Sequence, residues 1–149
     1  WRLQGGVDAA FIQDLMELRL AIEPAAALLA ARRAETPARE SVMALYAEMA
    51  RAAEVEDDRA AYVEADLAFH AGILTATGNQ FFVSLAPLIS SVLKASFTLS
   101  TVNRAAIRQS LPNHRAVAEA IARGDADGAA QAMSEHLTRA SDLYRQAGL

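Results

Sequence analysis

The sequence predicts an all-α protein, an antiparallel bundle of six to seven helices, and three observations support this class. The chain is 53% hydrophobic but only 6% aromatic, and alanine fills much of the difference. Alanine, leucine, glutamate and arginine favour helices, and apolar residues recur every three or four positions, which is the helical period. Runs of β-branched residues with the period of two that strands show are missing. At 149 residues the chain is long enough for one domain with its own core.

Composition excludes several classes of function. The chain has no cysteine, so disulfides, thiolate metal sites and cysteine nucleophiles are excluded. Its net charge of −4 gives no basic surface for nucleic-acid phosphates. We find no uninterrupted apolar run of about 18 residues and no signal-peptide pattern, so we expect no membrane span and a cytoplasmic protein. The chain starts without methionine, and we therefore expect a fragment of a longer protein.

Two helices are expected before the first histidine. Apolar spacing predicts one over about 8–34, which Pro24 should kink or divide. Thr36 and Pro37 predict an N-cap and a first helical position, opening a second helix that ends near Ala53. The residues expected to face inward are Val7, Phe11, Leu15, Leu18, Ile22, Ala26, Leu29, Val42, Leu45 and Met49.

The middle of the chain predicts two more helices. Asp57 or Asp58 should cap a third helix, which ends at Gly78 in a left-handed C-cap. A fourth helix follows over about 80–101, and Pro87 should kink it. Its second half is rich in hydroxyl groups, which is typical either of a solvated helix face or of the polar lining of a ligand cavity. Both interpretations stay open.

The last third of the chain predicts a helical hairpin. A helix begins after Asn103, and Pro112 should divide it into two pieces. Gly124 and Asp125 predict a C-cap followed at once by an N-cap, and the final helix covers about 126–146. The inward residues expected on these helices are Ile107, Leu111, His114, Val117, Ile121, Ala129, Met133, His136, Ala140 and Leu143.

Four side chains of the kind that bind metals are expected on inward faces. Asp66 and His70 lie four residues apart, so they share one face of a helix. His114 and His136 lie on the apolar stripes of two other helices. Buried imidazoles and carboxylates cost stability unless they have partners. Together these ligands suit Zn²⁺, Ni²⁺, Mn²⁺ or Fe²⁺, although a histidine on an apolar face is more often structural.

Two alternatives to ligand binding at a metal remain. The same four residues could activate water in a metal-dependent hydrolase or isomerase. That reaction needs a further acid or base, and neither Glu64 nor Glu119 is expected to face the site. The other alternative is a helical interaction module whose histidines are structural.

Five segments of the chain resemble one known family. Residues 66–70 and 76–79 resemble the "D-x-x-F-H … A-x-G-N" signature of the FadR C-terminal (FCD) domain, the effector-binding half of GntR-superfamily bacterial transcription regulators. Residues 114–125 match its "H-x-x-[IV]-x-x-A-I-x-x-G-D" segment, and 129–137 match "A-x-x-A-M-x-x-H-L". Residues 17–23 match "E-x-R-x-x-[IL]-E". The resemblance covers nearly the whole chain.

The resemblance implies a helical bundle with a buried divalent metal, foremost Zn²⁺, and a small carboxylic acid bound beside it. An arginine of the first helix meets that acid in such families, and Arg19 is the matching residue. Alternatively, Arg19 pairs with Glu23 on the surface. The metal ligands that the resemblance implies are Asp66, His70, His114 and His136.

The resemblance also indicates what lies outside the chain. The family's winged helix that binds DNA is absent, so residues 1–149 are expected to be a single effector-binding domain of a homodimeric regulator. The stretch 94–101 loosely resembles the sugar-acid branch of the family, which favours an aldonate or hexuronate over a fatty acyl ligand. The further effector-binding candidates are Ser91, Lys94, Thr98 and Asn103.

Overall fold

Six helices and no strands make up the part of the chain that the structure describes, residues 9–55, 59–99, 104–146 and 148. This computed structural model confirms the predicted all-α bundle. The helices are α1 (Ala9–Arg33), α2 (Thr36–Glu54), α3 (Arg59–Ala76), α4 (Gln80–Leu99), α5 (Arg104–Arg123) and α6 (Ala126–Gln146).

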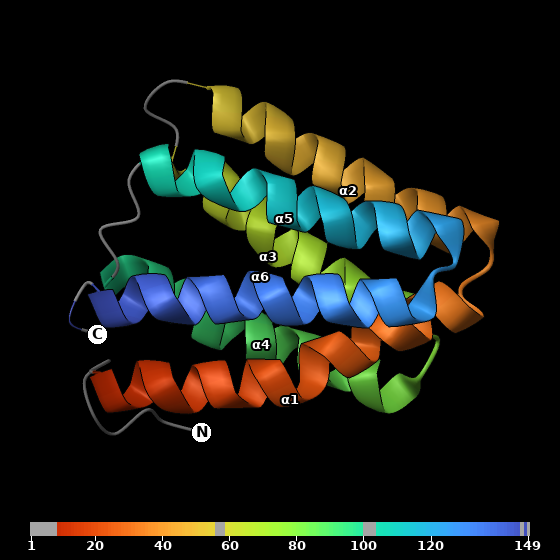
Figure 1. The fold of residues 1–149 in the computed structure, drawn as a ribbon, viewed down its shortest axis with the longest axis horizontal. Helices are drawn as coiled ribbons and strands as arrows, with labels where there is room; N and C mark the ends of the chain where they lie inside the picture. The colour runs from red at the N-terminus through yellow and green to blue at the C-terminus, as the bar shows by residue number, and fades with distance from the viewer. Residues whose placement is uncertain (1–8, 56–58, 100–103, 147, 149) are drawn as a thin grey trace.

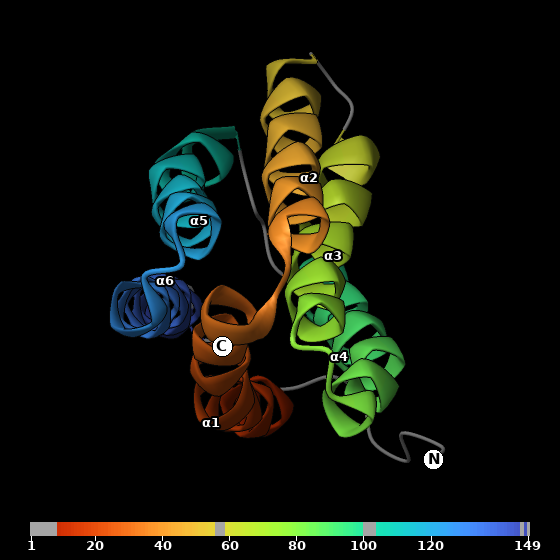
Figure 2. The ribbon, with the colours of Figure 1, turned by 90° about the vertical axis from the view of Figure 1, so that its right-hand side faces the viewer.

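The six helices form a closed ring (Figures 1 and 2). Going around it, α1 packs on α4, α4 on α3, α3 on α2, α2 on α5, α5 on α6, and α6 returns to α1. Helix α1 also contacts α3 and α5 across the ring. The three helices that carry histidines therefore all pack against α1.

Small side chains allow α1 to approach its neighbours closely. Ala26, Ala27, Ala30 and Ala31 are fully buried, and α1 makes its most extensive contact with α6. Larger residues fill the centre of the bundle, among them Phe69 of α3, which is also fully buried. Because protein interiors are close-packed, this core fixes the positions of the polar side chains that lie within it.

The α5–α6 connection forms as predicted, whereas the start of α2 differs by one residue. Gly124 adopts a φ of 71° and ends α5, and the Asp125 carboxylate accepts a hydrogen bond of 2.9 Å from the Gly128 amide. At α2 the N-cap is Glu35 and Thr36 is already helical, so the predicted Thr36 cap is wrong. Glu35 makes no side-chain cap bond, and the proline that follows Thr36 shapes this start instead. The predicted caps Asp57 and Asp58 lie outside the described residues.

The prolines inside α1, α4 and α5 do not divide these helices. Helix α1 continues through Pro24, and its path visibly turns partway along (Figure 1). Helix α4 contains Pro87 and α5 contains Pro112, and both helices are continuous. The predicted division at Pro112 is therefore wrong. A proline removes one backbone bond, and the packing of α5 on both α2 and α6 retains the remaining turns.

Two inward predictions are also wrong. Leu18 of α1 is 38% exposed and Leu143 of α6 is 43% exposed. On α1 the buried residues include Arg19, next to Leu18, and Glu23, a charged pair that an apolar pattern cannot reveal. On α6 the buried residue is Tyr144, whose hydroxyl lies 3.2 Å from the hydroxyl of Ser96.

Helix α4 is the most apolar of the six, yet most of its residues are not buried. The 18 residues Gln80–Phe97 have a mean hydropathy of 1.3, and 17% of them are buried. By length and composition alone this helix could cross a membrane, which for a single helix is a weak indication. In the bundle it packs against α3 and α1.

Candidate metal centre

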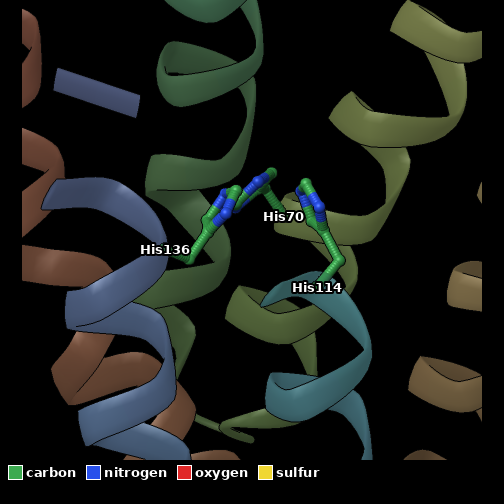
Figure 3. A group of neighbouring side chains, drawn as sticks. All are labelled: His70, His114 and His136. Carbon is green, nitrogen blue, oxygen red and sulfur yellow. The ribbon is translucent and has the colours of Figure 1, made fainter. Parts of the chain in front are cut away.

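Three histidines from three helices meet inside the bundle. Figure 3 shows the rings of His70 (α3), His114 (α5) and His136 (α6) grouped between their helices. One nitrogen of each lies within 4.8 Å of the others, and all three side chains are buried. The ring centres of His114 and His136 are 4.0 Å apart. This histidine triad could hold a metal ion.

Asp66 joins the triad, so all four predicted ligands lie in one cluster. Its Oδ1 is 3.0 Å from Nε2 of His114, and its Oδ2 is 3.9 Å from Nε2 of His70. Asp66 itself is only 4% exposed. Whether these four residues bind a metal stays a prediction, but their convergence satisfies its first requirement.

Hydrogen bonds orient two of the three rings, those of His114 and His70. Nδ1 of His114 donates to the backbone carbonyl of Ser110 at 3.0 Å. Nδ1 of His70 donates to the carboxylate of Glu23 at 2.5 Å. A ring whose one proton is on Nδ1 turns the lone pair of Nε2 inward, which is how a metal-ligating histidine is usually oriented.

The Nε2 atom of His114 is the strongest evidence that the cluster fits a cation. It is buried and has no hydrogen-bond partner, although Oδ1 of Asp66 lies 3.0 Å away. A lone pair that faces a carboxylate in a buried space is unfavourable unless a proton or metal ion lies near both. Imidazole nitrogens with one carboxylate suit Zn²⁺ and similar divalent ions. The residues present therefore fit the implied metal.

The electrostatics of the cluster favour the protonation states in which His136 and Asp66 can bind a metal. Burial lowers the pKa of His136 well below its usual 6.5, and the neighbouring His114, His70 and Arg19 lower it further. Burial alone would raise the pKa of Asp66, but contact with His114 and the nearby His70 and Arg19 lower it overall. His136 is therefore neutral and Asp66 ionised at neutral pH, as metal ligands must be.

Arg19 and Glu23 form a buried pair beside His70. The two side chains are 3% and 1% exposed, and Nε of Arg19 is 2.5 Å from Oε1 of Glu23. Nη2 of Arg19 also lies 3.3 Å from Nε2 of His70. The alternative that Arg19 pairs with Glu23 is thus correct about the partner and wrong about the surface. We had not identified Glu23 as a site residue, and its only sequence signal was its place at the end of the "E-x-R-x-x-[IL]-E" run.

Ser91 and Lys94, two of the other effector-binding candidates, are not part of the buried cluster. Ser91 is exposed on α4, and its hydroxyl donates to the carbonyl of Pro87 at 2.8 Å. Lys94 is also exposed and lies 2.6 Å from the carboxylate of Glu64. The side chain of Thr98 and the whole of Asn103 lie outside the described residues, so their roles stay predictions.

A pocket of about 260 Å³ reaches the cluster from outside, between α5 and α6. Polar side chains from both helices line it, and His136 is the ligand candidate that it touches. The lining residues are Gln109, Ser110, Asn113, His136, Arg139, Ala140, Asp142, Leu143 and Gln146.

Most of the chain matches a protein-family model. Residues 14–139 match the FCD domain, which accounts for most of the chain and includes all four predicted ligands. The chain is an FCD domain. The resemblance seen in the sequence motifs is therefore confirmed.

Curated relatives place this FCD domain among transcription regulators. It is 32% identical over 133 residues to the galactonate operon transcriptional repressor of Escherichia coli, covering 89% of this chain and 57% of the relative. It is 31% identical to the putative L-lactate dehydrogenase operon regulatory protein of the same species, covering 88% of this chain and 50% of the relative. The FCD domain thus spans about half the length of these relatives. They are regulators and not enzymes, so the hydrolase or isomerase alternative gains no support.

Solved structures share the fold of this FCD domain. Streptococcus agalactiae GntR superposes with a TM-score of 0.74 at 26% identity, over 89% of this chain and 58% of that one. Escherichia coli McbR/YncC gives a TM-score of 0.76 over 95% of this chain and 68% of that one. Its identity is 16%, so this second match shows the fold alone.

Acid should destabilise the metal-free FCD domain in two stages. The folded-state pKa of His136 is below 6.5, so the unfolded chain binds more protons and the free energy of unfolding falls as the pH drops below about 6.5. Glu23, whose pKa is lowered from 4.5 to about 2, adds a further loss between those values. Urea titrations from pH 8 to 3 in a metal chelator measure both stages. The variant His136→Gln should lack the first stage, and an unchanged slope in this variant would contradict the assignment.

Proposed function

We propose that this FCD domain senses a small carboxylic acid, foremost a sugar acid, at a divalent metal ion held by Asp66, His70, His114 and His136. The observation that carries the proposal is the buried, unbonded Nε2 of His114, 3.0 Å from Asp66. Among divalent ions we favour Zn²⁺. Ni²⁺, Mn²⁺ and Fe²⁺ are alternatives, because three imidazoles and one carboxylate suit these ions too.

Arg19 supports a carboxylate as the ligand. Its guanidinium lies 3.3 Å from the nitrogen of His70 that would bind the metal. The positive charge of Arg19 would therefore lie close to that of the metal ion. A carboxylate there would accept charge-assisted hydrogen bonds from Arg19, whose planar donors match its two oxygens. The same carboxylate would complete the shell of the metal, and the buried position would exclude competing water.

The class of acid is suggested by the relatives and by the pocket between α5 and α6. The names of two relatives mention galactonate and L-lactate, both of which carry a hydroxyl group next to the carboxylate. Asn113, Gln109 and Arg139 line the pocket beside His136 and could bond the hydroxyl groups of a longer acid. The α4 candidates Ser91 and Lys94, with Thr98 and Asn103, remain further proposed contacts.

The proposed role requires a larger protein. We infer that a winged helix, outside residues 1–149, binds DNA, and that the parent regulator is a cytoplasmic homodimer. The acid would contact α1 through Arg19 and the other helices through the metal ligands. Binding would therefore favour one arrangement of α1 against α3, α5 and α6, and this preference is the coupling free energy that an allosteric regulator needs.

A thermal-shift screen tests this proposal. The Zn²⁺-loaded chain is heated with galactonate, lactate, hexuronates and acetate. At about 100 times its Kd, the effector should add about 2.7 kcal/mol to the apparent stability. The shift should disappear when a chelator removes the metal. A shift that survives the chelator would contradict binding at the metal, and turnover of the acid would contradict a sensing role.

A further inference from the structure

Glu23 joins the two halves of the proposed site with its two carboxylate oxygens. Oε1 accepts a hydrogen bond from Nε of Arg19 at 2.5 Å, and Oε2 accepts one from Nδ1 of His70, also at 2.5 Å. The residue is 1% exposed, so water does not compete for these bonds. One buried side chain thus contacts both the residue proposed to bind the acid and a residue proposed to bind the metal.

The bond to His70 fixes the orientation of that ring. Because Glu23 accepts the Nδ1 proton, Nε2 keeps its lone pair, and this nitrogen lies 3.3 Å from Nη2 of Arg19 and 3.9 Å from Oδ2 of Asp66. A carboxylate behind a histidine increases the basicity of the ligating nitrogen and holds the ring plane, and losing such a partner typically weakens metal binding 10- to 100-fold. His114 has only a neutral carbonyl, that of Ser110, in the same position.

The bond to Arg19 sets the charge of the site. The positive charge of Arg19 and the negative charge of Glu23 cancel, and histidines that bind a metal must be neutral, so Asp66 would supply the one remaining charge of the metal-bound site. A divalent ion would then give the buried cluster a single excess positive charge. A ligand with one negative charge neutralises it, whereas a dianion leaves an uncompensated charge in the core, which is costly. The nearby Arg139 is largely exposed and screened by solvent.

We propose that Glu23 is a positioning residue that holds His70 for the metal and, by neutralising Arg19, restricts the effector to acids with a single negative charge. The part that concerns the effector rests on the proposed function. The part that concerns the metal does not, and the two can be tested separately.

The first experiment measures Zn²⁺ affinity by competition with a chromophoric chelator, without any acid. Glu23→Gln keeps an oxygen that accepts the Nδ1 proton but removes the charge, and Glu23→Asp keeps the charge but shortens the reach. Both should bind Zn²⁺ about 10- to 100-fold more weakly than the wild type. Glu119→Gln is the matched control, because Glu119 forms an i,i+4 pair with Arg115 on the surface. Unchanged Zn²⁺ affinity in Glu23→Asp and Glu23→Gln overturns the positioning role.

The second experiment measures the charge preference by calorimetry on the Zn²⁺-loaded chains. Galactitol, galactonate and galactarate share one polyol skeleton and carry zero, one and two carboxylates. The wild type and Glu23→Asp should prefer galactonate. In Glu23→Gln the site gains a positive charge, so the ratio of galactarate to galactonate affinity should rise about tenfold or more.

The outcomes separate the two proposals. An unchanged ratio in Glu23→Gln overturns the charge role of Glu23, as does a wild type that prefers galactarate. If the wild type binds neither acid, the sugar-acid form of the proposed function fails, and the Zn²⁺ affinities still decide the positioning role. If Glu23→Gln does not fold, by circular dichroism, Glu23→Asp decides that role, because it keeps the buried pair charged.

Discussion

Replacing His114 and His136 by alanine is expected to abolish metal binding by this FCD domain. The two residues come from different helices and their ring centres are 4.0 Å apart, so they form one wall of the cluster. Their loss leaves only Asp66 and His70, and two ligands do not hold a divalent ion against a chelator. Elemental analysis of the purified chain measures the result directly. The effector-induced thermal shift should be lost together with the metal.

The matched control for this variant is Arg115→Ala combined with Glu135→Ala. Each residue is the sequence neighbour of a histidine, and its side chain is more than half exposed on the same helix. The control should therefore keep its metal content. If His114→Ala with His136→Ala retains as much metal as this control, the assignment of the site is wrong and the histidines are structural.

Replacing Arg19 by methionine is expected to lower the free energy of unfolding by about 3–5 kcal/mol, because it leaves Glu23 ionised in the core without its main partner. The double variant Arg19→Met with Glu23→Leu removes both charges. Replacing a buried pair by apolar residues of similar size is often neutral or stabilising, so the double variant should regain part of the loss. The rest should remain, because Nδ1 of His70 loses its acceptor when Glu23 is replaced. Urea denaturation in a chelator, which keeps the chain free of metal, measures both.

The surface pair Arg115–Glu119 has the same i,i+4 spacing and serves as the control. Its arginine is 65% exposed at the side chain, so Arg115→Met should leave the urea midpoint almost unchanged. Equal losses in Arg19→Met and Arg115→Met would show that burial gives the inner pair no special role. A double variant no more stable than Arg19→Met would show that packing, and not charge, causes the loss.

The sequence predicted most of the fold because local chemistry fixes most helix limits. Gly124, in the left-handed conformation, ends α5, and the carboxylate of Asp125 caps the start of α6. Both interactions are local and do not depend on what the two helices pack against. The inward positions of His114 and His136 were predicted because both sit on clear apolar stripes. Pro112 was misjudged because the cost of one lost backbone bond is offset by packing on neighbouring helices, which no local pattern contains.

The site was predicted in part for a similar reason. Asp66 and His70 share a turn of one helix, so sequence spacing alone puts them together. Glu23 and Arg19 also share a turn, but the pattern could not reveal whether that turn faces water or the core. The exposed Leu18 and the buried Arg19 show that α1 is rotated away from its apparent apolar stripe. That rotation depends on what α1 packs against.

The sequence by itself determined that the chain is a helical bundle, where most of its helices begin and end, and which side chains are available as metal ligands, because these follow from interactions within a few residues. Only the tertiary structure decided that His70, His114, His136 and Asp66 meet, and that Glu23 lies behind them. The ring of helices brings together residues far apart in the chain. Which charges become partners in its core depends on the packing of all six helices at once.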